Sequence, residues 1–128
     1  MAGNFLIDTN VAIDYLDDKL PNPTSDVLDT EYLNMSVITR MELLAWRNAT
    51  TQHLSTLEEF IRSTNVYGLD ESVILKSIEL KRNHTIKLPD AIIAATAIVC
   101  DKILLTRNTN DFKNIEKIQL LNPWNQNI

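Results

Sequence analysis

Short apolar segments alternate with amphipathic ones along nearly the whole chain, and this alternation limits the possible folds more than any other feature. The short segments have the length of buried strands, and helical periodicity fills the stretches between them. We expect strands at residues 4–7, 34–38, 65–69, 102–106 and 118–121. We expect helices at about residues 9–17, 24–32, 39–47, 51–64, 72–83 and 89–101. Alternating strands and helices favour an α/β fold with a central, mainly parallel sheet between helical layers.

The chain has 128 residues, the size of one domain, and no linker or internal repeat divides it. We therefore expect residues 1–128 to form a single domain. Its one cysteine, Cys100, lies in an apolar run and is expected to be buried and unreactive. His53 and His84 do not have zinc-ligand spacing, so we expect both on the surface.

Targeting and membrane segments are not predicted. Phe5-Leu6-Ile7 is too short for the apolar region of a signal peptide. The longest nearly continuous apolar stretch, Ala91 to Cys100, is half the length needed to span a bilayer. We expect a soluble, cytoplasmic protein that does not associate with membranes.

Two features restrict how the chain can handle phosphate groups. With only two glycines it has neither a Walker A loop nor a dinucleotide-binding loop. Its net charge of −5 counts against broad electrostatic binding of nucleic acid. A nuclease remains possible, because a carboxylate cluster that binds divalent cations is itself acidic.

Four acidic residues lie near the expected carboxyl ends of the strands: Asp8, Glu42, Asp90 and Asp111. In a parallel sheet these ends meet at one edge, which is where ligands bind. Carboxylates brought so close repel one another unless cations lie between them. Oxygen ligands suit Mg²⁺ or Mn²⁺, which polarise a phosphodiester and activate an attacking water.

Each acidic residue also has a purely structural interpretation. Asp8 precedes a helix and can serve as its cap. Thr39 and Glu42 have the spacing of a capping box, and Asn108 and Asp111 have a similar spacing. Asp90 would stabilise the dipole of any helix that begins near Pro89. The order and placement of the four residues is a stronger argument than any one of them.

Four segments resemble the conserved motifs of PIN domains, in the family's order and over nearly the whole chain. They are Leu6-Ile7-Asp8-Thr9-Asn10-Val11, Ser36-Val37-Ile38-Thr39-Arg40-Met41-Glu42-Leu43, Leu88-Pro89-Asp90-Ala91-Ile92-Ile93-Ala94-Ala95-Thr96-Ala97 and Leu104-Leu105-Thr106-Arg107-Asn108-Thr109-Asn110-Asp111-Phe112. The ending, Gln119-Leu120-Leu121-Asn122-Pro123-Trp124, is also similar to the family's last strand. The resemblance implies a PIN-like three-layer fold and Mg²⁺- or Mn²⁺-dependent cleavage of RNA.

The resemblance also assigns roles to individual residues. It implies that Asp8, Glu42, Asp90 and Asp111 form the acidic pocket, with Asp8 and Asp90 as the main metal ligands. Asn10 and Thr106 would orient ligands or a phosphate, unless Asn10 only caps a helix and Thr106 only ends a strand. Arg107 would contact an RNA phosphate, unless it is a solvated loop residue.

The chain's size looks like that of the VapC toxin branch, whose members pair with a small antitoxin and commonly form homodimers. Met41 and Leu44 are expected in the core. Trp46 is a candidate for a dimer or antitoxin surface, and Phe60 for the same groove or for the core. Lys81, Arg82 and Lys87 either steer RNA or form a solvated helix end.

Other functions of similar folds fit the sequence less well. A haloacid-dehalogenase-like phosphatase needs a second carboxylate where this chain has Asn10, and a receiver domain needs a lysine that Thr106-Arg107-Asn108 does not supply. A PIN-like module that only binds RNA or protein remains open, and so does an RNA-processing nuclease that is not a toxin.

Overall fold

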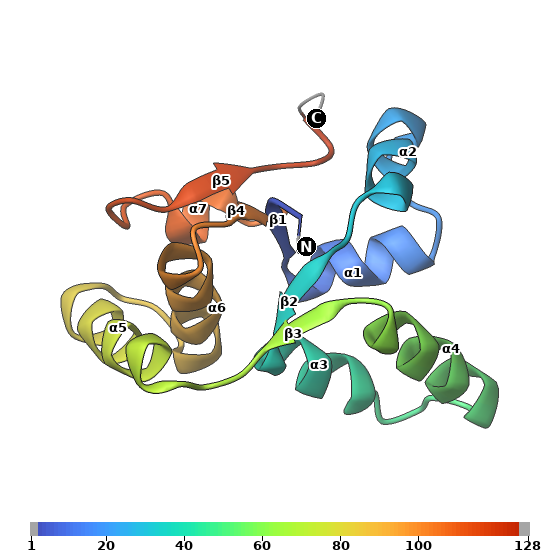
Figure 1. Ribbon diagram of the computed structural model, residues 1–128, viewed down its shortest axis with the longest axis horizontal. Coiled ribbons are helices and arrows are strands. Elements are labelled where there is room, and N and C mark those ends of the chain that lie inside the picture. The colour runs from blue at the N-terminus through green and yellow to red at the C-terminus, as the bar shows by residue number, and fades with distance from the viewer. Residues whose placement is uncertain (1–2, 126–128) are drawn as a thin grey trace.

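Five short parallel strands form the centre of the computed structural model, which describes residues 3–125 (Figure 1). They are β1 (Phe5–Ile7), β2 (Asn34–Ser36), β3 (Asn65–Tyr67), β4 (Ile103–Leu105) and β5 (Gln119–Leu121). Their order is β3-β2-β1-β4-β5, and every neighbouring pair is parallel. The prediction of an α/β fold with a mainly parallel sheet is confirmed.

Helices cover both faces of this sheet (Figure 1). They are α1 (Thr9–Leu16), α2 (Asn22–Thr30), α3 (Val37–Leu44), α4 (Thr51–Arg62), α5 (Glu71–Asn83), α6 (Leu88–Val99) and α7 (Thr109–Phe112). The helices α1 to α4 lie on one side, and α5 to α7 lie on the other. None of the helices within residues 3–125 combines the length and the apolar composition needed to cross a bilayer.

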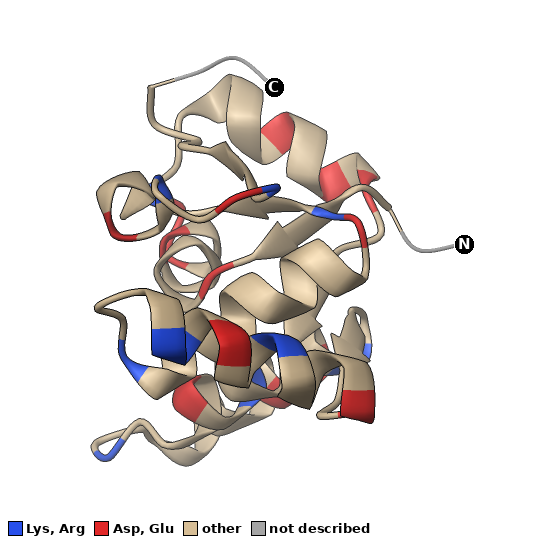
Figure 2. Cartoon of the chain, turned by 90° about the vertical axis from the view of Figure 1, so that its left-hand side faces the viewer, with Lys and Arg blue, Asp and Glu red and all other residues tan. Residues whose placement is uncertain are grey.

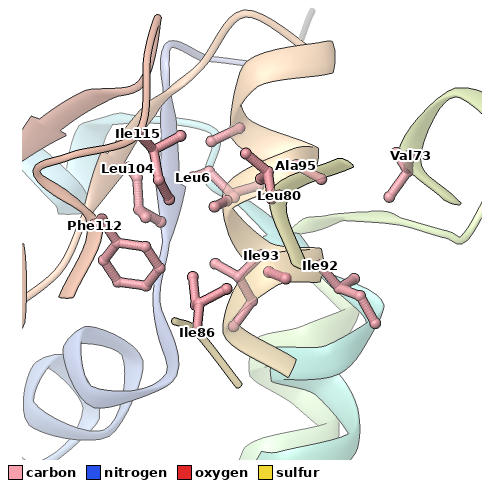
Figure 3. Close-up of a cluster of buried hydrophobic side chains, with 13 residues drawn as sticks. Leu6, Val73, Leu80, Ile86, Ile92, Ile93, Ala95, Leu104, Phe112 and Ile115 are labelled. Atoms are coloured by element: carbon pink, nitrogen blue, oxygen red, sulfur yellow. The ribbon is translucent and has the colours of Figure 1, made fainter. Parts of the chain in front are cut away.

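The period-two geometry of the strands divides the core in two. Leu6 and Leu104 point into a cluster with α5, α6 and α7, which includes Ile93 and Phe112 (Figure 3). The next residue on each strand, Ile7 or Leu105, packs into the other cluster, with α1 to α4. Successive side chains of a strand point to opposite faces, so two apolar residues in a row serve two cores.

The helix beginnings correct two of the capping interpretations. Ser36 caps α3 by accepting a hydrogen bond from the Ile38 amide at 3.0 Å, so α3 begins two residues earlier than predicted. Thr39 is therefore a buried residue inside the helix, and the capping box proposed for Thr39 and Glu42 is wrong. Asp8 is the cap of α1, as its structural interpretation allows, and Asn10 is the second residue of that helix rather than its cap.

Two further helices differ from expectation. α2 begins at Asn22, about two residues earlier than predicted, because Pro23 fits the first turn of a helix. α7 is a single turn whose Asn108 cap makes no side-chain capping bond. Phe112 anchors this turn, since its ring is fully buried beside α6 and β4 (Figure 3).

The cysteine and the two histidines lie in ordinary structural positions, away from the expected site. Cys100 is half-buried, and burial raises the pKa of its thiol, which disfavours the reactive thiolate. His53 is exposed and completes a capping box with Thr50 at the start of α4. His84 is half-buried at the end of α5, so the expectation of a surface position holds only in part for this residue.

Candidate active site

The four predicted carboxylates gather at the edge where the strands end. Asp8 directly follows β1, Asp90 is the third residue of α6, and Asp111 is the third residue of α7. Glu42 lies in the second turn of α3. The prediction placed it in the first turn, because the helix was expected to begin at Thr39. Burial raises the pKa of Asp90, and the negative charges of Asp8, Glu42 and Asp111 raise it further. The four groups therefore interact electrostatically, although they come from four different parts of the chain.

Asp8 is the most enclosed of the four, with 5% of its surface exposed. Its Oδ1 accepts a hydrogen bond from the Thr9 amide at 2.8 Å. Its Oδ2 accepts one from Thr106 Oγ1 at 2.8 Å and one from Asn10 Nδ2 at 3.2 Å. Burial, with a smaller contribution from Glu42, raises the pKa of Asp8, while these three donors oppose the rise. The carboxylate is thus fixed in orientation while its charge is only partly compensated.

A second set of hydrogen bonds holds these donors in place. Asn10 Oδ1 accepts from the Arg107 amide at 3.1 Å, and Thr106 Oγ1 accepts from the Asn108 amide at 3.0 Å. The loop after β4 is therefore tied to the residues that orient Asp8. Asn10 is therefore more than a helix cap and Thr106 is more than a strand end, because each side chain donates to the Asp8 carboxylate.

Glu42 is exposed but held by a neighbouring hydroxyl. Its Oε1 accepts a hydrogen bond from Thr9 Oγ1, and the Thr9 and Thr39 hydroxyl oxygens share a hydrogen bond of 3.1 Å. Thr9 and Thr39 were not predicted as site residues. Their position beside Asp8 and Glu42 in the two motifs was the available signal, but it did not distinguish them from capping residues.

Asp90 and Asp111 line a polar groove of about 460 Å³ with Lys81, Ile86 and Lys87. Lys87 lowers the pKa of Asp90, partly opposing the three carboxylates. The Lys81 ammonium donates to the Ile86 carbonyl at 2.7 Å, so it is held at the wall of the groove. Both lysines thus place positive charge beside Asp90 and Asp111.

Arg107 is an exposed loop residue whose side chain has two partners within the protein. Its guanidinium forms an ion pair with Asp14, which is buried on α1, and lies over the Trp124 ring at 4.5 Å from the centroid. These contacts fasten the loop after β4 to α1 and to the C-terminal segment. Sequence reasoning missed Asp14, because a single aspartate in a helix gave no sign of this partner.

A separate apolar groove of about 320 Å³ runs beside the carboxylates. Ile13 and Leu16 of α1, Leu43 of α3 and Leu57 of α4 line it, together with Trp46 and with Glu42 at its edge. Trp46 is 48% exposed and stacks on His53, with ring centroids 4.4 Å apart.

Three nearby apolar residues differ in how far they are buried. Met41 is 60% exposed, so its predicted place in the core is wrong. It lies two residues from both Thr39 and Leu43, the buried residues of α3, and therefore on the opposite side of that helix. Leu44 packs against the core as expected. Phe60 packs against the core and Tyr15 and does not line the groove.

The four carboxylates of the cluster are chemically suited to a hard divalent cation. Within residues 3–125 no group of three His, Cys, Asp or Glu side chains is positioned to hold a metal ion. All four clustered groups are carboxylates, the ligands that Mg²⁺ and Mn²⁺ prefer. The like-charge repulsion that raises the pKa of Asp90 is what a bound cation would relieve.

Comparisons with known proteins agree with this arrangement. The sequence profile of the PIN domain family matches residues 5–118. A relative described as Ribonuclease VapC, from Rickettsia bellii (strain RML369-C), is 29% identical over 126 residues. The match covers 91% of this chain and 93% of that relative.

Solved structures with the same fold come from toxin–antitoxin complexes. One, a toxin-antitoxin complex from Klebsiella pneumoniae, has a TM-score of 0.75 and 28% identity, covering 93% of this chain and 97% of that one. Another, DNA-bound VapBC from Salmonella typhimurium, has a TM-score of 0.80 and 25% identity. That match covers 94% of this chain and 98% of the other chain. The resemblance identified from the four motifs is confirmed.

The crowding of charge around Asp90 predicts a measurable effect on stability. The folded protein holds a proton on Asp90 more tightly than the unfolded chain does, so ionisation of Asp90 lowers the free energy of unfolding as pH rises through its folded-state pKa. Without divalent cations, Asp90→Asn should therefore raise Tm at pH 7. This gain should shrink toward about pH 4, where the unfolded carboxyl also binds a proton.

Thermal unfolding across this pH range would measure the effect, with Asp26→Asn as the matched control. Asp26 is an exposed aspartate on α2, away from the cluster. A Tm at pH 7 that is lower for Asp90→Asn than for the wild type would show that crowding does not dominate at Asp90.

Proposed function

Because the chain belongs to the PIN domain family, we propose that it is a Mg²⁺-dependent endoribonuclease and the toxin of a VapBC-type toxin–antitoxin pair, acting in the cytoplasm. The observation that carries the proposal is the convergence of four carboxylates, from four parts of the chain, at one edge of the sheet. Similarity to a ribonuclease VapC over nearly the whole chain supports RNA as the substrate.

In this proposal Asp8 and Asp90 are the principal metal ligands, and Glu42 and Asp111 complete the pocket directly or through water. A bound Mg²⁺ supplies charge that stabilises the phosphodiester transition state and lowers the pKa of an attacking water. Mn²⁺ has a similar ligand preference and is expected to substitute. Asn10 and Thr106 act on the reaction through Asp8, since their hydrogen bonds set the orientation of its carboxylate.

The lysines of the polar groove have a role in RNA binding. Lys81 and Lys87 line the groove that leads to Asp90, and we assign them electrostatic attraction of the RNA backbone. Arg107 acts differently, because its guanidinium is already paired with Asp14 and stacked on Trp124. In this proposal it supports the loop that carries Thr106, and its exposed side leaves the expected contact with an RNA phosphate to be tested.

Removing single charges from the site should separate catalysis from folding. Asp8→Asn and Asp90→Asn keep the side-chain size, and we expect either to lower the rate of RNA cleavage by about a hundredfold or more, the scale of a lost electrostatic contact in a transition state. Glu42→Gln should have a similar effect, because Glu42 caps no helix. Asp26→Asn should cleave at the wild-type rate. Cleavage by Asp8→Asn at the parent rate would reduce Asp8 to a helix cap.

The same variants distinguish the remaining alternatives. A PIN-like module that only binds RNA or protein would show no cleavage that depends on Asp8. An RNA-processing nuclease would cleave RNA, yet its expression alone would not arrest growth. A toxin should arrest growth through Asp8 and Asp90, and the product of a short neighbouring reading frame should relieve that arrest.

The apolar groove beside Glu42 is the proposed site for the antitoxin. Its lining is apolar, with 46% of Ile13 and 48% of Trp46 exposed, while Glu42 and Asp17 supply negative charge. An amphipathic helix fits such a groove, and an arginine or lysine at its end would pair with the carboxylates. The antitoxin would inhibit by competing with the metal ion for the site.

A substitution in the groove should separate inhibition from catalysis. Ile13→Glu places a charge in the apolar lining without touching the carboxylates, so the variant should still cleave RNA and arrest growth. The co-expressed antitoxin should no longer relieve the arrest or co-purify with the chain. Tyr32→Glu is the matched control, because Tyr32 is equally exposed but lies outside the groove. Full relief of Ile13→Glu would exclude this groove.

A further inference from the structure

Asp14 is a buried carboxylate on α1 that does not belong to the carboxylate cluster. With 8% of its surface exposed, it is nearly as enclosed as Asp8. Its partner is the Arg107 guanidinium, and within residues 3–125 no other basic side chain pairs with it. A buried carboxylate is costly to keep ionised unless it is paired, so the pair ties Arg107 firmly to α1.

The same side of α1 holds Arg107 at two points. Asn10 and Asp14 are four residues apart on this helix, so their side chains lie one turn apart on one face. Asn10 Oδ1 accepts a hydrogen bond from the Arg107 amide at 3.1 Å, while the Asp14 carboxylate pairs with the guanidinium. Both the backbone and the side chain of Arg107 are therefore fixed to α1.

A third contact comes from the C-terminal segment, which runs from β5 toward α2 (Figure 1). The Arg107 guanidinium lies over the Trp124 ring at 4.5 Å from its centroid. Trp124 packs against the core cluster on the side of α1 to α4. The Thr24 hydroxyl of α2 donates to the Pro123 carbonyl at 3.0 Å, so the segment is anchored next to this ring. Trp124 thus gives the guanidinium a fixed surface to pack on.

Two short paths lead from Arg107 to the Asp8 carboxylate. Asn10, which is held by the Arg107 amide, donates to Asp8 Oδ2 at 3.2 Å. Thr106, the residue before Arg107, donates to the same oxygen at 2.8 Å. Both side-chain donors to Asp8 therefore depend on where Arg107 is held. Partners that orient a metal ligand in this way typically change metal affinity or activity by about 10–100-fold.

We propose that Asp14 is a positioning residue which, by holding Arg107, fixes the orientation of the Asp8 carboxylate, with Trp124 as a second support. Asp14 contacts neither the metal ion nor RNA in this account and acts through Arg107 alone. The expected effect on cleavage rests on the proposed nuclease function, whereas the expected effect on the hydrogen bonds of Asp8 does not.

Contact with an RNA phosphate is the competing role for Arg107. Its side chain is 52% exposed, so part of the guanidinium can be reached from solvent. Acidic and basic positions are interspersed on the side of the molecule that carries α5 (Figure 2), so an additional cation beside the site would strengthen RNA binding. The two roles predict different kinetics, because loss of a phosphate contact raises KM, whereas loss of positioning lowers kcat.

Two substitutions separate these roles. Asp14→Asn keeps the side-chain size and removes its charge, and Arg107→Gln removes the other half of the pair. We expect each to lower kcat for RNA cleavage by about tenfold or more and to leave KM within about twofold. The double variant should lose no more than either single variant, because the two side chains act as one unit. A raised KM for Arg107→Gln, with Asp14→Asn at the wild-type kcat, would overturn the proposal in favour of the phosphate contact.

Nuclear magnetic resonance of the metal-free chain measures the positioning without catalysis. Asp14→Asn should speed exchange of the Arg107 amide proton with solvent by about tenfold or more and shift the side-chain amide signals of Asn10, because both report hydrogen bonds of this network. Asp29→Asn is the matched control. Asp29 is an exposed aspartate that accepts a hydrogen bond from the Tyr15 hydroxyl of α1, and its loss should change neither kcat nor these signals.

The two measurements keep this proposal distinct from the nuclease function. Amide signals that stay at their wild-type values in Asp14→Asn would overturn the positioning role whatever the activity. If the signals change but the wild type shows no metal-dependent cleavage, the nuclease function fails and the positioning role stands. Should Asp14→Asn not fold by circular dichroism, the double variant with Arg107→Gln, which leaves no buried charge unpaired, carries both measurements.

Discussion

The burial of the Asp8 carboxylate, held in place by three hydrogen-bond donors, is the constraint on which the rest of the site depends. Its carboxylate is buried, which raises its pKa, and it is kept in place by the Thr9 amide, Asn10 and Thr106. The Asn10 and Thr106 side chains are held in turn by backbone amides of residues 107 and 108. Asp8 thus links the end of β1, the central strand of the sheet, to the end of its neighbour β4. The repulsion between Asp8 and the neighbouring carboxylates of Glu42, Asp90 and Asp111 is not compensated by these hydrogen bonds. This repulsion is the physical reason to expect a divalent cation.

The parallel sheet explains why residues so distant in sequence meet at this point. All five strands end at the same edge, so the segments that follow β1, β2 and β4 are brought together whatever their sequence. The convergence of the site residues is therefore a consequence of the sheet architecture, in which the carboxyl ends of parallel strands meet at one edge.

The fold and the four carboxylates were predictable from the sequence because local signals carry them. Strand length, helical periodicity and the acidic residues after strands are properties of short segments. The errors involve choices that tertiary contacts decide. Ser36 and Thr39 are both capable caps, and the burial of Thr39 beside Thr9 settles which is used. Likewise, no local signal joins Arg107 to Asp14 and Trp124, which come from opposite ends of the chain.

The central claim is that these carboxylates act by holding a metal ion, and removal and return of the metal tests it most directly. The purified wild-type chain should lose RNA cleavage in EDTA and regain it when Mg²⁺ is added in excess, because the carboxylates alone supply no positive charge to stabilise the phosphodiester transition state. A parallel preparation of Asp8→Asn shows any cleavage due to a contaminating nuclease. Cleavage by the wild type that exceeds this background and continues undiminished in EDTA would contradict the account.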